Sequence, residues 1–213
     1  MEVFRFVFNP IDANTYVITD GSGECAVIDC GCYDPGEFDE LNSFILEKKL
    51  KPVLLLNTHC HLDHIFGDIF MLGSYNLRAF CHMDDIPNRK YARTHAEFFG
   101  LKMKDPPEPQ GFLSDGQIVS FGETELKVIH VPGHSAGSVA FHSEKEGIVF
   151  TGDTLFSGSI GRTDLPGGNF ETIINSIRTR LFTLPGNTIV YPGHMEDTSV
   201  GRERDTNPFF IAN

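Results

Sequence analysis

The chain has 213 residues, of which 40% are hydrophobic, and it carries a formal net charge of −12. This length fits one ordinary α/β domain spanning residues 1–213, with room for a sizeable core. The sequence holds no run of about 18 apolar residues, so no membrane span is expected, and its acidity argues against nucleic-acid binding.

Short apolar segments near the N-terminus predict three antiparallel strands, at residues 4–8, 15–19 and 25–29, with a turn at 20–23. A helix should follow. Asp34 suits its N-cap and Pro35 its first position, while Phe38, Leu41 and Ile45 recur on one face.

The most informative segment comes after the next apolar strand, at residues 53–56. It reads His59-Cys60-His61-Leu62-Asp63-His64, which places four potential ligands within one turn of chain, and a short helix should start near Asp63. Histidine nitrogen and carboxylate oxygen suit Zn, Fe or Mn. Packing alone does not explain such a cluster at the end of a strand.

Residues 82–114 are charged, aromatic and proline-rich. They predict a surface helix followed by a loop, and the alternative is a flap over a site. Strands are expected again from about residue 117 to 150, and then a helix with one apolar face made by Phe170, Ile173, Ile174, Ile177 and Leu181. Two sheets packed face to face with helices outside accommodate this order.

Three later strands repeat the pattern of a strand, a turn-forming glycine and a ligand, at Gly133-His134, Gly152-Asp153 and Gly193-His194. Ligands at strand ends have rigid backbone behind them, which allows distant residues to converge. The complete set of candidate ligands is His59, His61, Asp63, His64, His134, Asp153 and His194.

Seven ligands are too many for one tetrahedral ion and suit two divalent ions, Zn above all, with Fe or Mn as alternatives. His59, His61 and His134 are assigned to the first ion and Asp63, His64 and His194 to the second. Asp153 is the natural bridge, and water completes an open, catalytic site.

This order of ligands resembles the metallo-β-lactamase superfamily, and within it the short glyoxalase II-like hydrolases. Further similar segments lie at residues 133–138, 152–156, 159–164 and 203–209. The resemblance implies an α/β fold, an αββα sandwich of two mixed β-sheets with helices outside. It also implies cleavage of a small-molecule thioester, such as S-lactoylglutathione, by a metal-bridging hydroxide. Asp63 would be the catalytic residue that orients this hydroxide.

Three other functions stay open. The persulfide dioxygenases bind one iron through residues matching His59, His134 and Asp153, a set suited to oxygen chemistry. Lactone hydrolysis needs only a different pocket, and a non-catalytic metal-binding protein is the third option.

The sequence departs from the glyoxalase II pattern in two places. Only a short tail follows His194, where full-length glyoxalase II has a helical domain that contacts glutathione. Met195-Glu196 stands where the short relatives have Gly-Pro.

The remaining polar residues have competing interpretations. Asp29 is either a hydrogen-bond partner of a ligand imidazole or a turn former. Arg162 and Asp164 are candidate substrate-binding residues, with an internal salt bridge as the alternative. Cys60 is expected to be a buried thiol, and the non-ligand histidines are expected to be His82, His95, His130 and His142.

The five cysteines are odd in number and scattered, so no disulfide framework is expected. No signal-peptide pattern is recognised, which predicts a cytoplasmic protein with no membrane partner. The sequence does not specify the oligomeric state.

Overall fold

Two six-stranded sheets form the centre of the computed structural model, which describes residues 1–211. The first sheet has the order β1-β2-β3-β4-β5-β6, made of β1 (Glu2–Phe8), β2 (Ala13–Thr19), β3 (Glu24–Ile28), β4 (Lys51–Leu56), β5 (Ala79–His82) and β6 (Gly111–Leu113). β1, β2 and β3 are antiparallel, as predicted, whereas β3 to β6 run parallel.

The second sheet has the order β14-β13-β10-β9-β8-β7. Its strands are β7 (Ile118–Phe121), β8 (Thr124–His130), β9 (Val139–Ser143), β10 (Ile148–Gly152), β13 (Ile189–Pro192) and β14 (Thr198–Ser199). β10 and β13 are parallel and the other pairs are antiparallel, so both sheets are mixed. A separate two-stranded ribbon joins β11 (Leu155–Phe156) to β12 (Ser159–Ile160).

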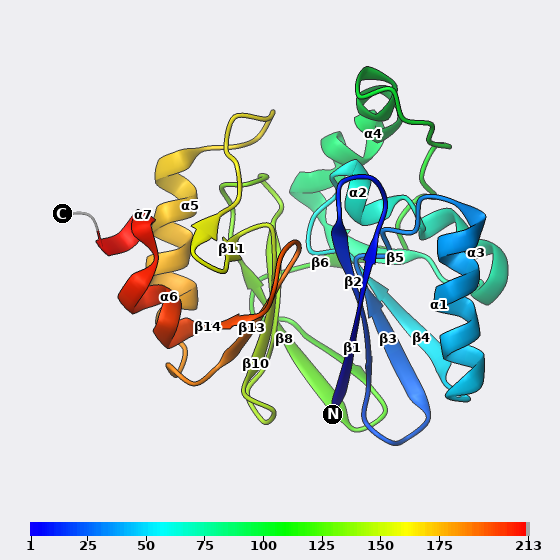
Figure 1. The fold of residues 1–213 in the computed structure, drawn as a ribbon, viewed down its shortest axis with the longest axis horizontal. Helices are drawn as coiled ribbons and strands as arrows, with labels where there is room; N and C mark the ends of the chain where they lie inside the picture. Colours follow the sequence, from blue (N-terminus) through cyan, green and yellow to red (C-terminus); the bar gives the residue numbers. More distant parts are fainter. Residues whose placement is uncertain (212–213) are drawn as a thin grey trace.

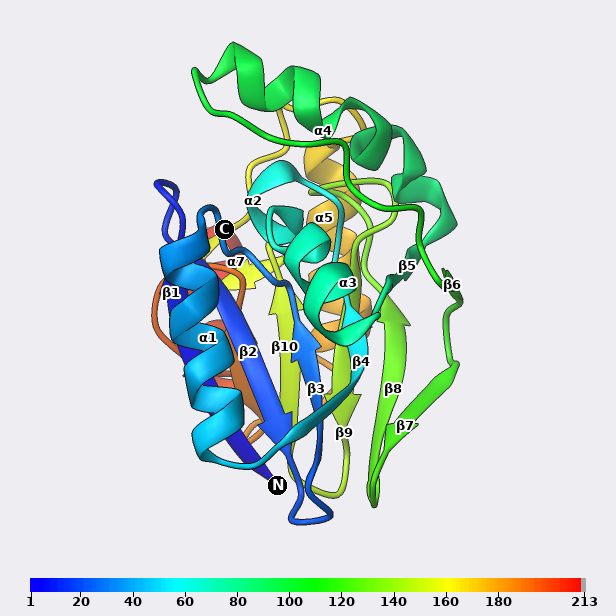
Figure 2. The ribbon, with the colours of Figure 1, turned by 90° about the vertical axis from the view of Figure 1, so that its right-hand side faces the viewer.

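Helices cover the outer face of each sheet, as Figures 1 and 2 show. The first half contributes α1 (Pro35–Glu47), α2 (Leu62–Ile65), α3 (Asp68–Tyr75), the 3₁₀ turn η1 (Met83–Asp85) and α4 (Ile86–Phe98). The second half contributes α5 (Phe170–Ser176), the π-helical segment η2 (Ile177–Leu181), α6 (Val200–Thr206) and α7 (Pro208–Ile211). The predicted arrangement of two mixed sheets with helices outside is confirmed.

The alternation of side chains along each strand explains this layering. On β2, Tyr16 and Ile18 pack against Phe141 and Phe150 of the second sheet, in the core between the sheets. Val17, between them in sequence, belongs to a second cluster under α1 and α3. A third cluster joins the outer face of the second sheet to α5 and η2.

The predicted N-cap of α1 is confirmed, because the Asp34 carboxylate accepts hydrogen bonds from the backbone N–H groups of Gly36 and Glu37 at 2.8 and 3.1 Å. The predicted apolar face at 170–181 is only partly right. Ile173, Ile177 and Leu181 are buried, but Phe170 is 48% exposed at the start of α5, where its ring lies beside the Phe209 ring.

The segment 82–114 contains the predicted helix, α4, but it is more embedded than expected. Arg89 and Ala92 on α4 are buried, and residues 111–113 add β6 to the edge of the first sheet. In Figure 2, α4 lies beyond the ends of the strands, at the edge of the sandwich where the loops after β4 and β5 emerge.

Candidate metal centre

Three histidines from two loops meet at one point. His59 and His61 follow β4, whereas His134 follows β8. His134 Nε2 lies 3.2 Å from His59 Nε2 and 2.8 Å from His61 Nδ1, and all three side chains are buried. A tetrahedral zinc ion with bonds of 2.0–2.1 Å holds its nitrogen ligands about 3.3 Å apart. The spacing therefore suits one ion, after a small outward shift of His61.

A second group lies beside the first and combines a carboxylate with two imidazoles. Asp63 and His64 belong to α2, and His194 follows β13. Asp63 Oδ2 is 3.2 Å from His194 Nε2 and 3.4 Å from His64 Nε2. By distance these three residues are able to hold one ion together.

The Asp153 carboxylate lies between the two groups. Its Oδ1 is 3.3 Å from His64 Nε2, and its Oδ2 is 3.6 Å from His134 Nε2 and 3.5 Å from His194 Nε2. Asp153 Oδ1 and His64 Nε2 are both buried. Although they lie 3.3 Å apart, neither forms a hydrogen bond with the other or with any other group among residues 1–211. Buried polar atoms normally have a partner, and divalent cations would supply one here. The donor set therefore fits two metal ions.

Hydrogen bonds on the far side of the rings fix their orientation. His64 Nδ1 donates to Asp29 Oδ2 at 3.1 Å, His134 Nδ1 to the Arg162 carbonyl at 2.8 Å, and His194 Nδ1 to the Asp12 carbonyl at 2.9 Å. Such bonds leave the opposite nitrogen free to bind a metal. Asp29 is therefore a hydrogen-bond partner of the His64 imidazole and also turns the chain, with a φ of 53°, whereas the role of His64 as a metal ligand stays a prediction.

Thr58 is a supporting residue that the sequence analysis missed. Its N–H and its hydroxyl both donate to the Asp29 carboxylate, at 2.7 and 2.6 Å, and its oxygen lies 3.1 Å from His59 Nδ1. Its position directly before His59 was the only available signal. The Asp29–Thr58 pair thereby connects the loop after β3 to the loop after β4.

The two groups differ in their affinity for protons. Burial, followed by the neighbouring His64 imidazole, lowers the pKa of His59, and burial together with His134 lowers the pKa of His61 to about 3. Burial would raise the pKa of Asp63, but His64 holds it well below its usual value. Burial would lower the pKa of His64, but the carboxylates of Asp63 and Asp153 outweigh it and raise this pKa. His59 and His61 thus present neutral imidazoles, and the second group presents charge-paired side chains.

The other predicted residues lie around this centre. Arg162 and Asp164 form an exposed bidentate ion pair, with two contacts of 2.7 Å, so the predicted internal salt bridge is confirmed. Cys60 is a buried thiol, as predicted. His82, Asp84 and His130 also approach one another closely enough to hold an ion, although the two rings stack in parallel at 4.3 Å. The prediction that these histidines are not ligands stays a prediction.

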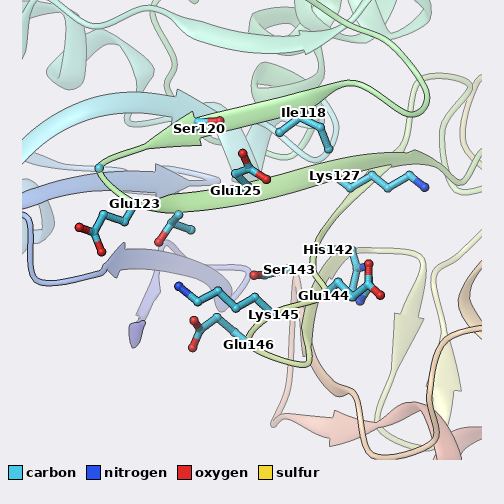
Figure 3. A pocket seen from close by; sticks show the side chains of 12 residues that line it. Ile118, Ser120, Glu123, Glu125, Lys127, His142, Ser143, Glu144, Lys145 and Glu146 are labelled. Atoms are coloured by element: carbon cyan, nitrogen blue, oxygen red, sulfur yellow. The ribbon is translucent and has the colours of Figure 1, made fainter.

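A surface hollow lies elsewhere, over β7, β8 and β9 (Figure 3). Its wall carries charges of both signs, including Glu123, Glu125, Lys127 and Lys145, and none of the candidate ligands. In residues 1–211, no helix has the length and apolar character needed to cross a bilayer.

Comparison with known proteins agrees with this geometry. The sequence is 35% identical to the probable metallo-hydrolase YqgX of Bacillus subtilis, with 96% of this chain and 95% of the relative covered. It is 36% identical to the hydroxyacylglutathione hydrolase GloC of Haemophilus influenzae, with 92% of each covered.

Solved structures share the fold over nearly the whole chain. BLEG-1 B3 metallo-beta-lactamase matches with a TM-score of 0.89 and 29% identity, covering 99% of this chain and 100% of its own. TTHA1623 in a di-iron-bound form matches with a TM-score of 0.88 and 37% identity, covering 97% of this chain and 100% of its own. ETHE1 from Myxococcus xanthus matches with a TM-score of 0.80 and 25% identity, covering 98% of this chain and 84% of its own. Residues 9–194 match the Metallo-beta-lactamase superfamily, and the chain belongs to that superfamily.

Proposed function

We propose that the protein is a dinuclear metal-dependent hydrolase that cleaves thioesters such as S-lactoylglutathione. The superfamily and the His/Asp groups support a metallohydrolase that uses divalent ions. The observation that carries the proposal is the convergence of seven candidate ligands into two adjacent groups joined by Asp153. The likeness to GloC, named as a hydroxyacylglutathione hydrolase, favours a thioester substrate.

The roles of the residues follow from their positions. His59, His61 and His134 would hold one ion, Asp63, His64 and His194 the other, and Asp153 would contact both. When bound, two divalent ions supply a water of lowered pKa and positive charge beside the substrate carbonyl. Zinc is the first choice for these ligands, and the di-iron form of TTHA1623 makes iron a specific alternative.

Asp63 is the proposed catalytic residue. Its carboxylate lies 3.4 Å from His64 Nε2 and 3.2 Å from His194 Nε2, so it is placed within the second group to orient a water molecule and accept its proton. A thiol leaves readily because its pKa is about 8.5, whereas an amine must first be protonated. No acid beyond the candidate ligands is assigned to that protonation, which favours thioesters over β-lactams.

Arg162 and Asp164 remain the proposed substrate contacts. Both side chains are exposed and both lie on the loop whose Arg162 carbonyl accepts a hydrogen bond from His134. A substrate at the first group would therefore pass close to this ion pair. The salt bridge would limit the reach of each side chain while keeping the loop in one shape.

One specific observation favours a second function. His59, His134 and Asp153 approach one another within the site, through His134 Nε2 at 3.2 Å from His59 Nε2 and 3.6 Å from Asp153 Oδ2. Two histidines and one carboxylate form the set that non-haem iron oxygenases use. The likeness to ETHE1 keeps a mononuclear iron persulfide dioxygenase as the alternative.

The test is the loss of thioester absorbance with S-lactoylglutathione, using metal-reconstituted protein. Asp63→Ala should slow the reaction by about 10²-fold or more, as expected for loss of a general base. Asp39→Ala, an exposed carboxylate on α1, is the matched control and should keep full activity. A fully metallated protein without thioesterase activity would reject the proposal. Oxygen uptake with glutathione persulfide would then identify the alternative, and a β-lactam and a lactone complete the panel.

A further inference from the structure

A fully buried carboxylate lies directly behind the first histidine group. Asp85, the last residue of η1, is 0% exposed. Its Oδ2 accepts a hydrogen bond from the Cys60 N–H at 2.5 Å, and its Oδ1 accepts from the Gly137 N–H at 3.0 Å and from Asn88 Nδ2 at 3.2 Å. Among residues 1–211 no cationic side chain forms an ion pair with it. Its charge is therefore satisfied by N–H donors alone.

The two backbone donors belong to the two loops that carry the first group. Cys60 stands between His59 and His61, and Gly137 lies three residues after His134. Each carboxylate oxygen thus holds one loop, and the rigid O–C–O unit sets the distance between the loops. Hydrogen bonds that N–H groups donate to a carboxylate are stronger than those between neutral groups, which makes Asp85 an effective spacer.

The contact between Asp85 and the second loop is unusually close. A Cβ atom on Gly137 would lie 2.6 Å from the Asp85 backbone nitrogen and 2.8 Å from its Cβ. Only glycine fits there without a shift of one backbone or the other. A second link lies nearby, where the Val139 N–H donates to the Thr58 carbonyl at 2.8 Å. The loops are thus joined by two links, which flank His59 in the first loop and follow His134 in the second.

We propose that Asp85 is a positioning residue that sets the spacing of His59 and His61 relative to His134, and thereby the affinity of the first metal group. This inference rests on the metal-binding part of the proposed function, and not on the thioester substrate. The position of metal-binding imidazoles tolerates little error, since mutating the hydrogen-bonded partners behind metal ligands commonly lowers the affinity for the metal 10–100-fold.

The test is a zinc titration of metal-free protein against a chromophoric chelator. Asp85→Asn keeps the shape of the side chain but replaces one acceptor oxygen with an amide donor, so one loop N–H loses its partner. We expect one of the two zinc affinities to fall about 10–100-fold and the other to stay within about twofold of the wild-type value. In a His134→Ala background, where the first group is already lost, Asp85→Asn should leave the remaining affinity unchanged.

Glu203→Gln provides the matched control. Glu203 is equally buried and accepts hydrogen bonds from the Gly158 N–H and from Asn207 Nδ2, each at 2.8 Å, but it touches neither histidine loop. The Glu203→Gln protein should bind both ions as the wild type does, even if its thermal stability falls as far as that of the Asp85→Asn protein. Gly137→Ala perturbs the same contact from the opposite loop and should reproduce the selective weakening, which provides a second variant if Asp85→Asn does not fold.

Equal zinc affinities in Asp85→Asn and the wild type would overturn the inference, as would a parallel loss in Glu203→Gln. The titration needs no substrate, so its outcome is separate from that of the thioesterase assay. Selective weakening without thioesterase activity would uphold the positioning role and reject the substrate class. Wild-type protein that binds no zinc would overturn both the positioning role of Asp85 and the proposed dinuclear zinc site.

Discussion

Replacing Arg89 by Met should destabilise the protein strongly, although α4 was expected on the surface. Arg89 is 3% exposed, and its guanidinium donates to Asp68 Oδ2 at 2.7 Å, to Asn57 Oδ1 at 3.2 Å and twice to the Pro107 carbonyl. The Arg89→Met variant keeps much of the side-chain volume but leaves the Asp68 carboxylate buried and unpaired.

The expected cost is that of breaking a buried ion pair by removing one partner, about 3–5 kcal/mol of unfolding free energy. For a domain of this size, each kcal/mol lowers the melting temperature by about 2–4 °C, so the total is roughly 6–20 °C. Thermal and urea unfolding followed by circular dichroism at pH 8 measure both quantities.

The pH dependence makes the prediction specific. Burial raises the pKa of Asp68 to about 6 against the opposing effect of Arg89, from an ordinary value of 3.8. Because the folded state binds this proton more tightly, the contribution of Asp68 to stability is full below about pH 4 and is lost as the pH rises through 6. Without Arg89 the pKa rises further. The destabilisation of Arg89→Met should therefore be clearly smaller at pH 5 than at pH 8.

A double variant separates charge from packing. Arg89→Met with Asp68→Leu removes both charges and should recover most of the lost stability, since apolar replacement of a buried pair is often neutral. A loss below 1 kcal/mol in Arg89→Met, or an equal loss at pH 5 and pH 8, would refute the reasoning.

Two glycine substitutions should have different consequences, one for stability and the other for metal content. Gly133→Ala places a Cβ against the backbone of Ile173 at the start of α5 and demands a side chain at a φ of 133°, so it should lower the melting temperature of metal-free protein severely. Gly193→Ala places its Cβ against Asp153 Oδ1 and 2.8 Å from His64 Cε1, so it should mainly lower zinc content, measured by elemental analysis. Unchanged zinc content in Gly193→Ala, or unchanged melting of Gly133→Ala, would contradict these assignments.

Much of the fold followed from local patterns. Short apolar segments and the turn at residues 20–23 predicted β1, β2 and β3, and the Asp34-Pro35 pair placed the start of α1 correctly. These features depend on neighbouring residues alone, so they are legible in a single sequence. The convergence of the ligands was also predictable in part, because His59, His134, Asp153 and His194 each lie just after a strand, namely β4, β8, β10 and β13.

Features that depend on distant partners were not predictable. Arg89 and Asp85 lie in a segment that is charged and proline-rich, which indicates a solvated surface. Both are buried because their partners arrive from elsewhere: Asp68 from α3, and Gly137 from the loop after β8. No local pattern distinguishes them from the exposed charges of the same segment, such as Asp105.

The glycine before each later ligand has a physical reason that the sequence pattern only suggested. Gly133 and Gly152 have φ values of 133° and 50°, a backbone region in which side chains are strained. A Cβ on Gly152 would also strike the Thr58 side chain, which holds Asp29, and a Cβ on Gly193 would strike Asp153. Crowding by Ile173 at Gly133, by Thr58 at Gly152 and by Asp153 at Gly193 leaves no room at these positions for any residue but glycine.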